Sequence, residues 1–376
     1  DVETMERYLR QAIETNPDVL RPRILLSKAS LDAGDSQAAF DVLAGVPLDG
    51  SPAALALKAE AASRLGRYGE AKSALESLAS IAPKDPSVQM ELVKVYSALG
   101  DDFRAEQAIV RLSKLAAEDA RVKLAMSKLR AKQGKFEEAE ALIDSSGLAP
   151  EDPRVLSARL AVVLLAERHE ESAYYARQLF ETDENSANAV ELSRALAVSG
   201  NQDESVAVLN DWLDSNPRDI RVRVELANRY QRLGDHEGYI EELFRILEVD
   251  SNNLFALNNL AWNLRMQSPV EALSYARAAN KQAPESAAIM DTLAMVYARN
   301  QDFKNALRFI AKAVDADPTV SVYRLHRAEI KSASGDKEGA VVELRRLLRE
   351  FPTDEIKSEA ESLLIQLDDE ASAHAR

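Results

Sequence analysis

Glycines recur along this chain at a near-constant interval, each at the junction of two stretches rich in helix-forming residues. Most steps between successive turn positions are 34 residues, and the others lie within two residues of that value. A period of this length predicts helix–turn–helix units that each pack on their neighbours, and hence an all-α solenoid rather than a compact fold. The turn positions are Gly34, Gly66, Gly100, Gly134, Gly200, Gly234 and Gly335, with Arg168, Ser268 and Gln301 standing where glycine is expected in the other three units.

Each unit repeats the same residue types at fixed distances from its turn. A large apolar and a small residue, such as Leu226-Ala227, come eight and seven residues before it, and an alanine such as Ala105 comes five residues after it. The turn glycine can end the first helix in a left-handed conformation, and small side chains let two helices approach closely. The pattern resembles the tetratricopeptide repeat family over nearly the whole chain, which implies a right-handed superhelical solenoid with first helices lining its concave groove.

We expect four segments along the chain. Residues 1–19 are predicted to be the second helix of a truncated repeat, residues 20–353 ten repeats forming one solenoid, residues 354–369 a capping helix and residues 370–376 a frayed tail. Because the chain opens at Asp1 without an initiator Met or a lipidation motif, we interpret it as a fragment or processed product of a longer protein. The predicted repeats begin near residues 20, 53, 86, 119, 153, 186, 219, 253, 286 and 320.

Composition restricts the classes of function. The net charge of −15 disfavours binding to nucleic acid or to anionic membranes, and the absence of cysteine excludes disulfides and thiolate chemistry. No apolar stretch approaches the ~18 residues that a membrane span needs. The four histidines have no metal-ligand spacing, and no glycine-rich phosphate loop is present. We therefore expect no enzymatic site, no cofactor and no metal.

The repeat also allows the residues that face the groove to be assigned in every unit. The resemblance implies that inward positions fall 13, 10, 6, 3 and 2 residues before each turn, and the eighth unit is aligned on Leu260-Ala261 because its turn is shorter. Of these 50 positions twelve are basic and four acidic, so the predicted groove carries +8 in a chain that has 47 basic and 62 acidic residues. The basic positions are Arg21, Lys28, Arg64, Lys94, Arg121, Lys128, Lys132, Arg194, Arg221, Arg232, Arg265 and Arg299, and the acidic ones are Asp32, Glu60, Asp291 and Glu329.

Two interpretations of this charge remain open. Long Arg and Lys stems could cover neighbouring apolar surface while their charges stay in water, and cations also suit the end of a first helix. Alternatively, the groove attracts an anionic ligand, such as an acidic peptide, a C-terminal carboxylate or a uronic-acid-containing polysaccharide. The centre of such a site would be the cluster of Arg121, Lys128, Lys132, Arg194, Arg221 and Arg232, with the amides of Asn228 and Gln231 beside it.

Two parts of the predicted groove are less basic. The fifth unit presents an apolar strip, which is either a hydrophobic step for a partner or a place of closer packing. The eighth and ninth units present an aromatic and Met surface that suits a peptide pocket, unless Trp262 belongs to the core of its repeat. The strip is Val155, Ala158, Val162, Leu165 and Ala166, and the peptide pocket is Phe255, Asn258, Trp262, Arg265, Met266 and Met295, followed by Arg299.

Residues 252–318 carry a closer resemblance. The chain reads Ala-Leu-Asn-Asn-Leu-Ala-Trp over residues 256–262, Glu-Ala-Leu-Ser-Tyr-Ala over 271–276, then Ala283-Pro284 and Asp-Thr-Leu over 291–293. This succession is similar to the C-terminal repeats of the TPR-repeat lipoproteins of bacterial PEP-CTERM exosortase systems, which accompany exopolysaccharide gene clusters. That family usually continues with Gly-Trp, where this chain has Ala294-Met295. The resemblance implies a periplasmic or outer-membrane-associated scaffold of a Gram-negative bacterium, and a lipid anchor upstream would fit it.

Together these observations predict a non-enzymatic scaffold that holds a partner protein or an anionic polymer in its groove, with a role in exopolysaccharide assembly or PEP-CTERM protein export implied by the resemblance alone. The partner is expected to be an acidic protein or peptide, or an anionic exopolysaccharide, and not nucleic acid. Two alternatives stay open: a cytoplasmic co-chaperone or assembly adaptor that captures acidic peptide segments, and the regulatory arm of a larger enzyme.

Overall fold

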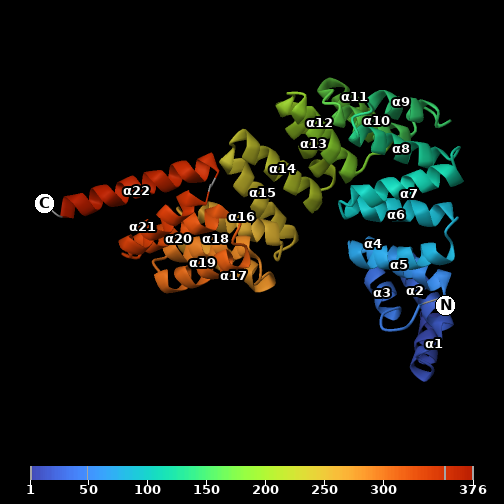
Figure 1. The fold of residues 1–376 in the computed structure, drawn as a ribbon, viewed down its shortest axis with the longest axis horizontal. Helices are drawn as coiled ribbons and strands as arrows, with labels where there is room; N and C mark the ends of the chain where they lie inside the picture. The colour runs from blue at the N-terminus through green and yellow to red at the C-terminus, as the bar shows by residue number, and fades with distance from the viewer. Residues whose placement is uncertain (1, 49, 351–352, 375–376) are drawn as a thin grey trace. The chain divides into compact units, whose positions relative to one another are not determined.

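The computed structural model describes residues 2–48, 50–350 and 353–374, and within them 22 α-helices follow one another without a strand. Contacts divide the chain into two compact units, Asp1–Glu184 and Asn185–Arg376, each of which is described here by itself (Figure 1). The first unit contains α1 (Val2–Thr15), α2 (Leu20–Asp32), α3 (Ser36–Val42), α4 (Pro52–Arg64), α5 (Tyr68–Ile81), α6 (Pro86–Ala98), α7 (Asp102–Leu115), α8 (Ala120–Lys132), α9 (Phe136–Asp144), α10 (Pro153–Leu165) and α11 (His169–Thr182).

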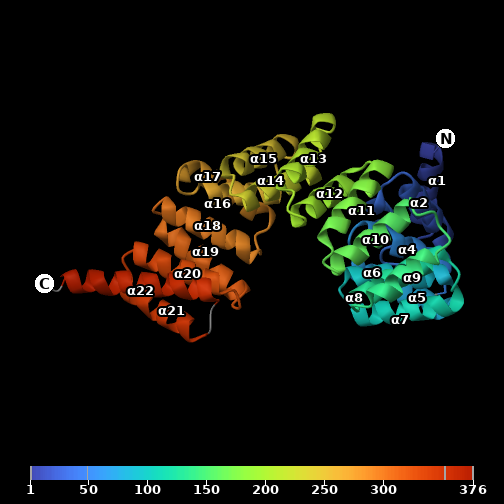
Figure 2. The same ribbon diagram turned by 90° about the horizontal axis from the view of Figure 1, so that it is seen from above.

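In both units each helix packs on the next one along the chain, and several even-numbered helices also contact the next even-numbered helix, as α2 contacts α4 and α16 contacts α18. Even-numbered helices are therefore the first helices of the repeats, and this order of packing is typical of a tetratricopeptide solenoid (Figure 2). The second unit contains α12 (Ser186–Val198), α13 (Gln202–Ser215), α14 (Ile220–Leu233), α15 (His236–Val249), α16 (Leu254–Leu264), α17 (Pro269–Gln282), α18 (Ala287–Arg299), α19 (Phe303–Ala316), α20 (Ser321–Ala333), α21 (Lys337–Arg349) and α22 (Asp354–His374).

The predicted turn glycines all take the left-handed conformation. At Gly100 the φ angle is 70°, its N–H donates to the Ser97 carbonyl (3.2 Å), and the next N–H, of Asp101, donates to the Tyr96 carbonyl (2.9 Å). These two bonds satisfy carbonyls at the end of the first helix, and glycine adopts the required angle without a Cβ penalty. Gln301, which was predicted to stand in for glycine, has φ 62° and the same two bonds.

The turn of the fifth unit lies one residue earlier than predicted. Glu167, not Arg168, has the positive φ of 56°, and Arg168 is the N-cap of α11. The Arg168 N–H donates to the Val163 carbonyl at 2.9 Å, the bond that Asp101 makes in its own unit. Five residues after Glu167 comes Ser172, which is fully buried, whereas the predicted Ala173 is only half-buried. The physical turn is therefore at Glu167, and the alignment on Arg168 was wrong.

Ser268 was likewise predicted to occupy a glycine position, and it does not take the left-handed conformation. Its φ angle is −136°, it is the N-cap of α17, and its N–H donates to the Leu264 carbonyl at 2.8 Å. The helix α16 is correspondingly short, with 11 residues. The connection is thus a tighter turn, as the alignment of this unit on Leu260-Ala261 assumed.

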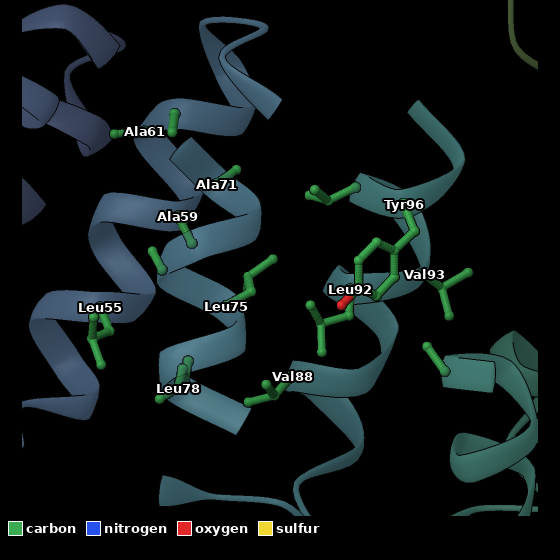
Figure 3. Close-up of a cluster of buried hydrophobic side chains, with 14 of the residues drawn as sticks. Leu55, Ala59, Ala61, Ala71, Leu75, Leu78, Val88, Leu92, Val93 and Tyr96 are labelled. Carbon is green, nitrogen blue, oxygen red and sulfur yellow. The ribbon is translucent and has the colours of Figure 1, made fainter. Parts of the chain in front are cut away.

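Small buried side chains hold each helix pair together. Figure 3 shows buried side chains of α4, α5 and α6 in the first unit's core, with Ala59, Ala61 and Ala71 among larger residues such as Leu75. Ala71, five residues after its turn, is completely buried, and so are Ala39, Ala139, Ala306 and Ala340 at the same position of other units. Larger side chains such as Leu75 and Leu92 fill the space between successive pairs, each contributing roughly 1.5–3 kcal/mol on full burial.

The helix α22 continues the array beyond the last pair. It contacts both α20 and α21, as a first helix of a further repeat would, and its Ile356, Leu363, Leu364 and Leu367 pack on the last repeat as predicted. The helix runs to His374, so the predicted end at residue 369 and the frayed tail at 370–376 were wrong as far as His374; the last two residues lie outside the described part of the chain. No helix among the described residues is long and apolar enough to cross a membrane.

Candidate partner-binding surface

In the first unit, a cavity of about 770 Å³ opens between the first helices α4 and α6, over Leu75 and Leu78 of α5. Small side chains such as Ala53, Ala56 and Ser63 on α4 leave space between the two helices. All five inward positions predicted for α4 line it, together with two predicted for α6. These residues are Ala53, Ala56, Glu60, Ser63 and Arg64 of α4, and Ser87 and Lys94 of α6.

Most predicted cations of the first unit have an acidic partner nearby. Lys94 pairs with Glu91 at 2.6 Å, and Lys132 reaches Asp102 at 2.9 Å. Arg121 binds Asp119 at 2.6 Å, and Arg64 binds Glu60 at the same distance. These pairs are largely exposed and therefore contribute little to stability. In each pair, however, the carboxylate offsets the positive charge that the cation would present to a ligand.

Lys128 is different because its ammonium has no carboxylate partner in the described structure. Its Nζ lies 3.4 Å from the Ser157 hydroxyl on the next first helix, and partial desolvation by the surrounding protein lowers the pKa of Lys128. Arg21 and Lys28 of α2 are also exposed and lack ion pairs with described residues. The first unit therefore keeps a few cations available for a ligand.

The apolar strip predicted for the fifth unit is wrong as an inner surface. Val155, Ala158 and Val162 are buried in the core, because the turn lies at Glu167 rather than at Arg168. The corrected inward positions include a basic residue, Arg154, whose guanidinium binds Asp152 at 2.7 Å. Equal steps of 33 residues from Gly134 to Glu167 and on to Gly200 could have indicated this turn. The corrected positions are Arg154, Ser157, Ala161, Leu164 and Leu165, all exposed or half-buried.

In the second unit, Arg194 belongs to an internal ion-pair network. Its Nε and Nη2 donate to the Glu225 carboxylate at 3.0 and 2.7 Å, and the buried Arg229 donates to the other oxygen of Glu225. Burial alone would raise the pKa of Glu225, but the hydrogen bonds from the two arginines outweigh burial and hold it below its usual value. Arg194 therefore joins α12 to α14, and its charge is already compensated.

In the second unit, the helix α14 carries two unpaired cations of the predicted groove. Arg221 and Arg232 are exposed and form no ion pair with any residue that the structure describes. Gln231 is exposed beside them, and Asn228 is half-buried. Two unpaired guanidinium groups and two amides thus lie on one first helix.

A second cavity, of about 420 Å³, lies at the C-terminal end of the second unit. It brings together four of the predicted pocket residues, whereas Phe255 packs against the core and Asn258 is half-buried, with its Oδ1 lacking a hydrogen-bond partner. Six further residues of α20 and α22 complete the cavity. Its lining is Trp262, Arg265, Met295, Arg299, Val322, His326, Glu329, Glu355, Ile356 and Glu359.

Trp262 contributes to the core and also to this cavity. It packs against the hydrophobic cluster of the unit, while the Arg265 guanidinium lies 3.6 Å from its ring centroid and donates to its carbonyl at 2.5 Å. The His326 ring lies 5.5 Å away. Burial lowers the pKa of Arg265, and the nearby charge of Arg299 lowers it further. Trp262 is thus partly a core residue of its repeat and partly a wall of the cavity.

Sequence reasoning missed His326 and the carboxylates of α22. The His326 Nδ1 lies 2.8 Å from Asp291. Burial alone would lower the pKa of His326, but its hydrogen bond to Asp291 and the charge of that residue raise it above its usual value. Aligning α22 as another first helix, with its turn position 34 residues after Gly335, would have placed Ile356 and Glu359 at inward positions, which is the signal that could have found this wall.

Comparison with known proteins places two segments in a family. Models of the tetratricopeptide repeat match residues 62–129 and 287–320. Both segments are tetratricopeptide repeats. The helix pairing along both units agrees with this family, and its repeats serve widely as protein-interaction scaffolds rather than as catalysts.

No curated protein matches this chain by sequence. Among solved structures, residues 41 to the end of MamA from Desulfovibrio magneticus RS-1 are similar with 19% identity and a TM-score of 0.40, over 43% of this chain and 92% of that one. The MamA RS-1 ArsTM double mutant gives 19% identity and a TM-score of 0.39, over 43% and 91%. Likeness at this level carries no inference about function. The resemblance to PEP-CTERM lipoproteins stays a prediction.

Proposed function

We propose that this tetratricopeptide repeat protein is a non-enzymatic scaffold that binds an extended partner, a protein segment or an anionic polymer, along its first helices. The observation that supports the proposal most is that the inward positions of the first helices line an open cavity in each unit. A repeat array offers such a surface at every unit, so affinity can be distributed over many small contacts. A role in exopolysaccharide assembly or PEP-CTERM protein export, in the periplasm or at the outer membrane, follows from the resemblance of residues 252–318.

The unpaired cations of α14 indicate where an acidic partner would bind first. Arg221 and Arg232 form no ion pair with a described residue that a partner would have to displace, whereas Arg194 would have to leave the buried Glu225. The energetic cost of breaking an existing pair makes Arg194 the weaker contributor to binding. Within the second unit, we therefore place the basic centre predicted from sequence on α14, and Lys128 of α8 is its unpaired member in the first unit.

Binding of labelled probes tests the proposal. The probes are an acidic peptide and polygalacturonate, a uronic-acid polymer, and the readout is fluorescence anisotropy at rising salt. We expect binding that weakens with salt and that falls at least tenfold in Arg221→Glu/Arg232→Glu. The matched control is Lys281→Glu/Lys304→Glu, the same charge change at exposed residues of the second helices α17 and α19. An equal loss in both variants would mean that net charge, not this surface, governs binding.

A further inference from the structure

The walls of the C-terminal cavity differ in the sign of their charge. Arg265 of α16 and Arg299 of α18 form one side, and Glu329 of α20 with Glu355 and Glu359 of α22 form the other. The helices α16, α18, α20 and α22 contact one another in this order, as Figure 2 shows for the second unit. The charge along the inner surface therefore changes from positive to negative across the cavity.

None of these five charged groups forms an ion pair within the described part of the chain. The Arg265 Nε is buried and has no hydrogen-bond acceptor, and its guanidinium faces the like charge of Arg299. On the opposite wall, burial raises the pKa of Glu329 and the charge of Glu359 adds to the effect, while the positive charges of His326, Arg299 and Arg265 oppose it. The two walls thus attract each other across the cavity without forming a direct ion pair, and each can still receive a group of opposite charge.

The floor of the cavity selects further among ligands. Met295, Val322 and Ile356 give it an apolar character that suits an aliphatic side chain. A sugar ring would need an open aromatic face, but Arg265 already covers Trp262 at 3.6 Å. A uniformly anionic polymer would also meet three carboxylates on the α20 and α22 side, where like charges repel it.

We propose that this cavity binds a dipolar segment of a partner protein, with acidic side chains beside α16 and α18, basic side chains beside α20 and α22, and aliphatic side chains between them. The inference rests on the proposed scaffold function and narrows its ligand at this place from an anionic polymer to a protein. A segment of about six extended residues would span roughly 20 Å, enough to place opposite charges at its two ends.

Three peptides of equal length test the pairing of charges. All three have a central Leu-Leu. The mixed peptide has Asp-Asp at one end and Lys-Lys at the other, the uniform acidic peptide has Asp-Asp at both ends, and the uniform basic peptide has Lys-Lys at both ends. In Arg221→Glu/Arg232→Glu, which removes the acidic-peptide site proposed for α14, we expect the mixed peptide at low salt to bind at least tenfold more tightly than either uniform peptide, and the α22 variants below are made in the same background. The uniform acidic peptide binding equally well would overturn the inference.

Reversing the charge of two glutamates on α22 provides a second test of the pairing of charges. Glu355→Lys/Glu359→Lys should shift the preference to the uniformly acidic peptide, and both residues are exposed and unpaired, so the fold should tolerate the change. Glu361→Lys/Asp369→Lys makes the same change at exposed residues of α22 outside the cavity and should keep the preference for the mixed peptide. The same preference in both variants would overturn the inference.

The two proposals can fail separately. If polygalacturonate and acidic peptides still bind through Arg221 and Arg232 while no peptide responds to changes at Glu355 and Glu359, the dipolar site is wrong and the scaffold proposal stands. If no charged probe binds the native chain at all, both proposals are wrong.

Discussion

Replacing Glu225 by Gln tests whether the buried ion-pair network holds the second unit together. The Glu225 side chain is 4% exposed and accepts four N–H bonds, at 2.7–3.1 Å, from Arg194 and Arg229. Glutamine has nearly the same shape but no charge, and its amide NH₂ would point at one of the two guanidinium groups. The substitution therefore removes the compensating charge with little change in volume.

The loss of stability in Glu225→Gln depends on which arginine is left without its carboxylate partner. Arg229 is 5% exposed and pairs with no other carboxylate of the described residues, so it becomes a buried uncompensated charge, which costs about 3–5 kcal/mol in comparable cases. Arg194 is half-exposed and keeps Glu191 at 3.4 Å, so its contribution is small. We expect the free energy of unfolding to fall by about 3 kcal/mol, near the lower end of this range, which lowers the folding equilibrium constant roughly a hundredfold.

Tryptophan fluorescence isolates this effect, because both tryptophans of the chain, Trp212 and Trp262, lie in the second unit. With a urea dependence of about 2–3 kcal/mol per molar, the fluorescence midpoint should fall by roughly 1 M. Glu241→Gln is the control, since it removes an exposed carboxylate that pairs with Arg245, and it should shift the midpoint by less than about 0.3 M. Equal shifts in the two variants would refute the reasoning.

Three further predictions follow from the packing and the turns. Glu167→Gly should stabilise the first unit by about 1 kcal/mol, since the left-handed conformation penalises a Cβ, and circular dichroism during urea unfolding measures it. Ala71→Leu should cost about 1–3 kcal/mol by the same measurement, because Ala71 is completely buried between α4 and α5. The pKa of His326 is raised in the folded state, so its protonation stabilises the fold fully below the unfolded pKa of about 6.5, and this stabilisation is lost as pH rises through the folded pKa. The urea midpoint of the fluorescence transition should therefore be lower at pH 9 than at about pH 6. The difference should be smaller in His326→Asn.

Features that depend on the same small residue in every repeat could be predicted from the sequence. A glycine at a helix end and an alanine five residues later have a local steric reason, so Gly100 and Ala71 lie where the period placed them. Glu167 could not be found in this way, because a left-handed non-glycine residue leaves no local signature. The pair Leu160-Ala161 imitated the repeat motif one residue out of register and displaced the inward positions of that helix.

The charge state of the inner surface was harder to predict because it depends on pairing between repeats. Arg194 and Arg232 were both predicted as groove cations, yet Arg194 pairs with Glu225, 31 residues later, and Arg232 pairs with no carboxylate in the described structure. A glutamate at a buried helix position was the available hint, since burying a carboxylate demands a cationic partner. The period gives the face of each residue but not its partner.

The pairing also explains how an acidic chain carries a basic inner surface. In the first unit the partners lie two to four residues away on the same helix, as Glu91 does for Lys94, or just after the preceding turn, as Asp102 does for Lys132. Such pairs keep like charges on successive first helices from repelling one another at the close spacing that alanine packing imposes. Arg221, Arg232, Arg265 and Arg299, like Lys128 of the first unit, form no direct ion pair with a described residue, so water and counterions screen much of their charge. An acidic partner can replace this solvent without displacing a carboxylate of the chain, and this is the physical reason to look for it there.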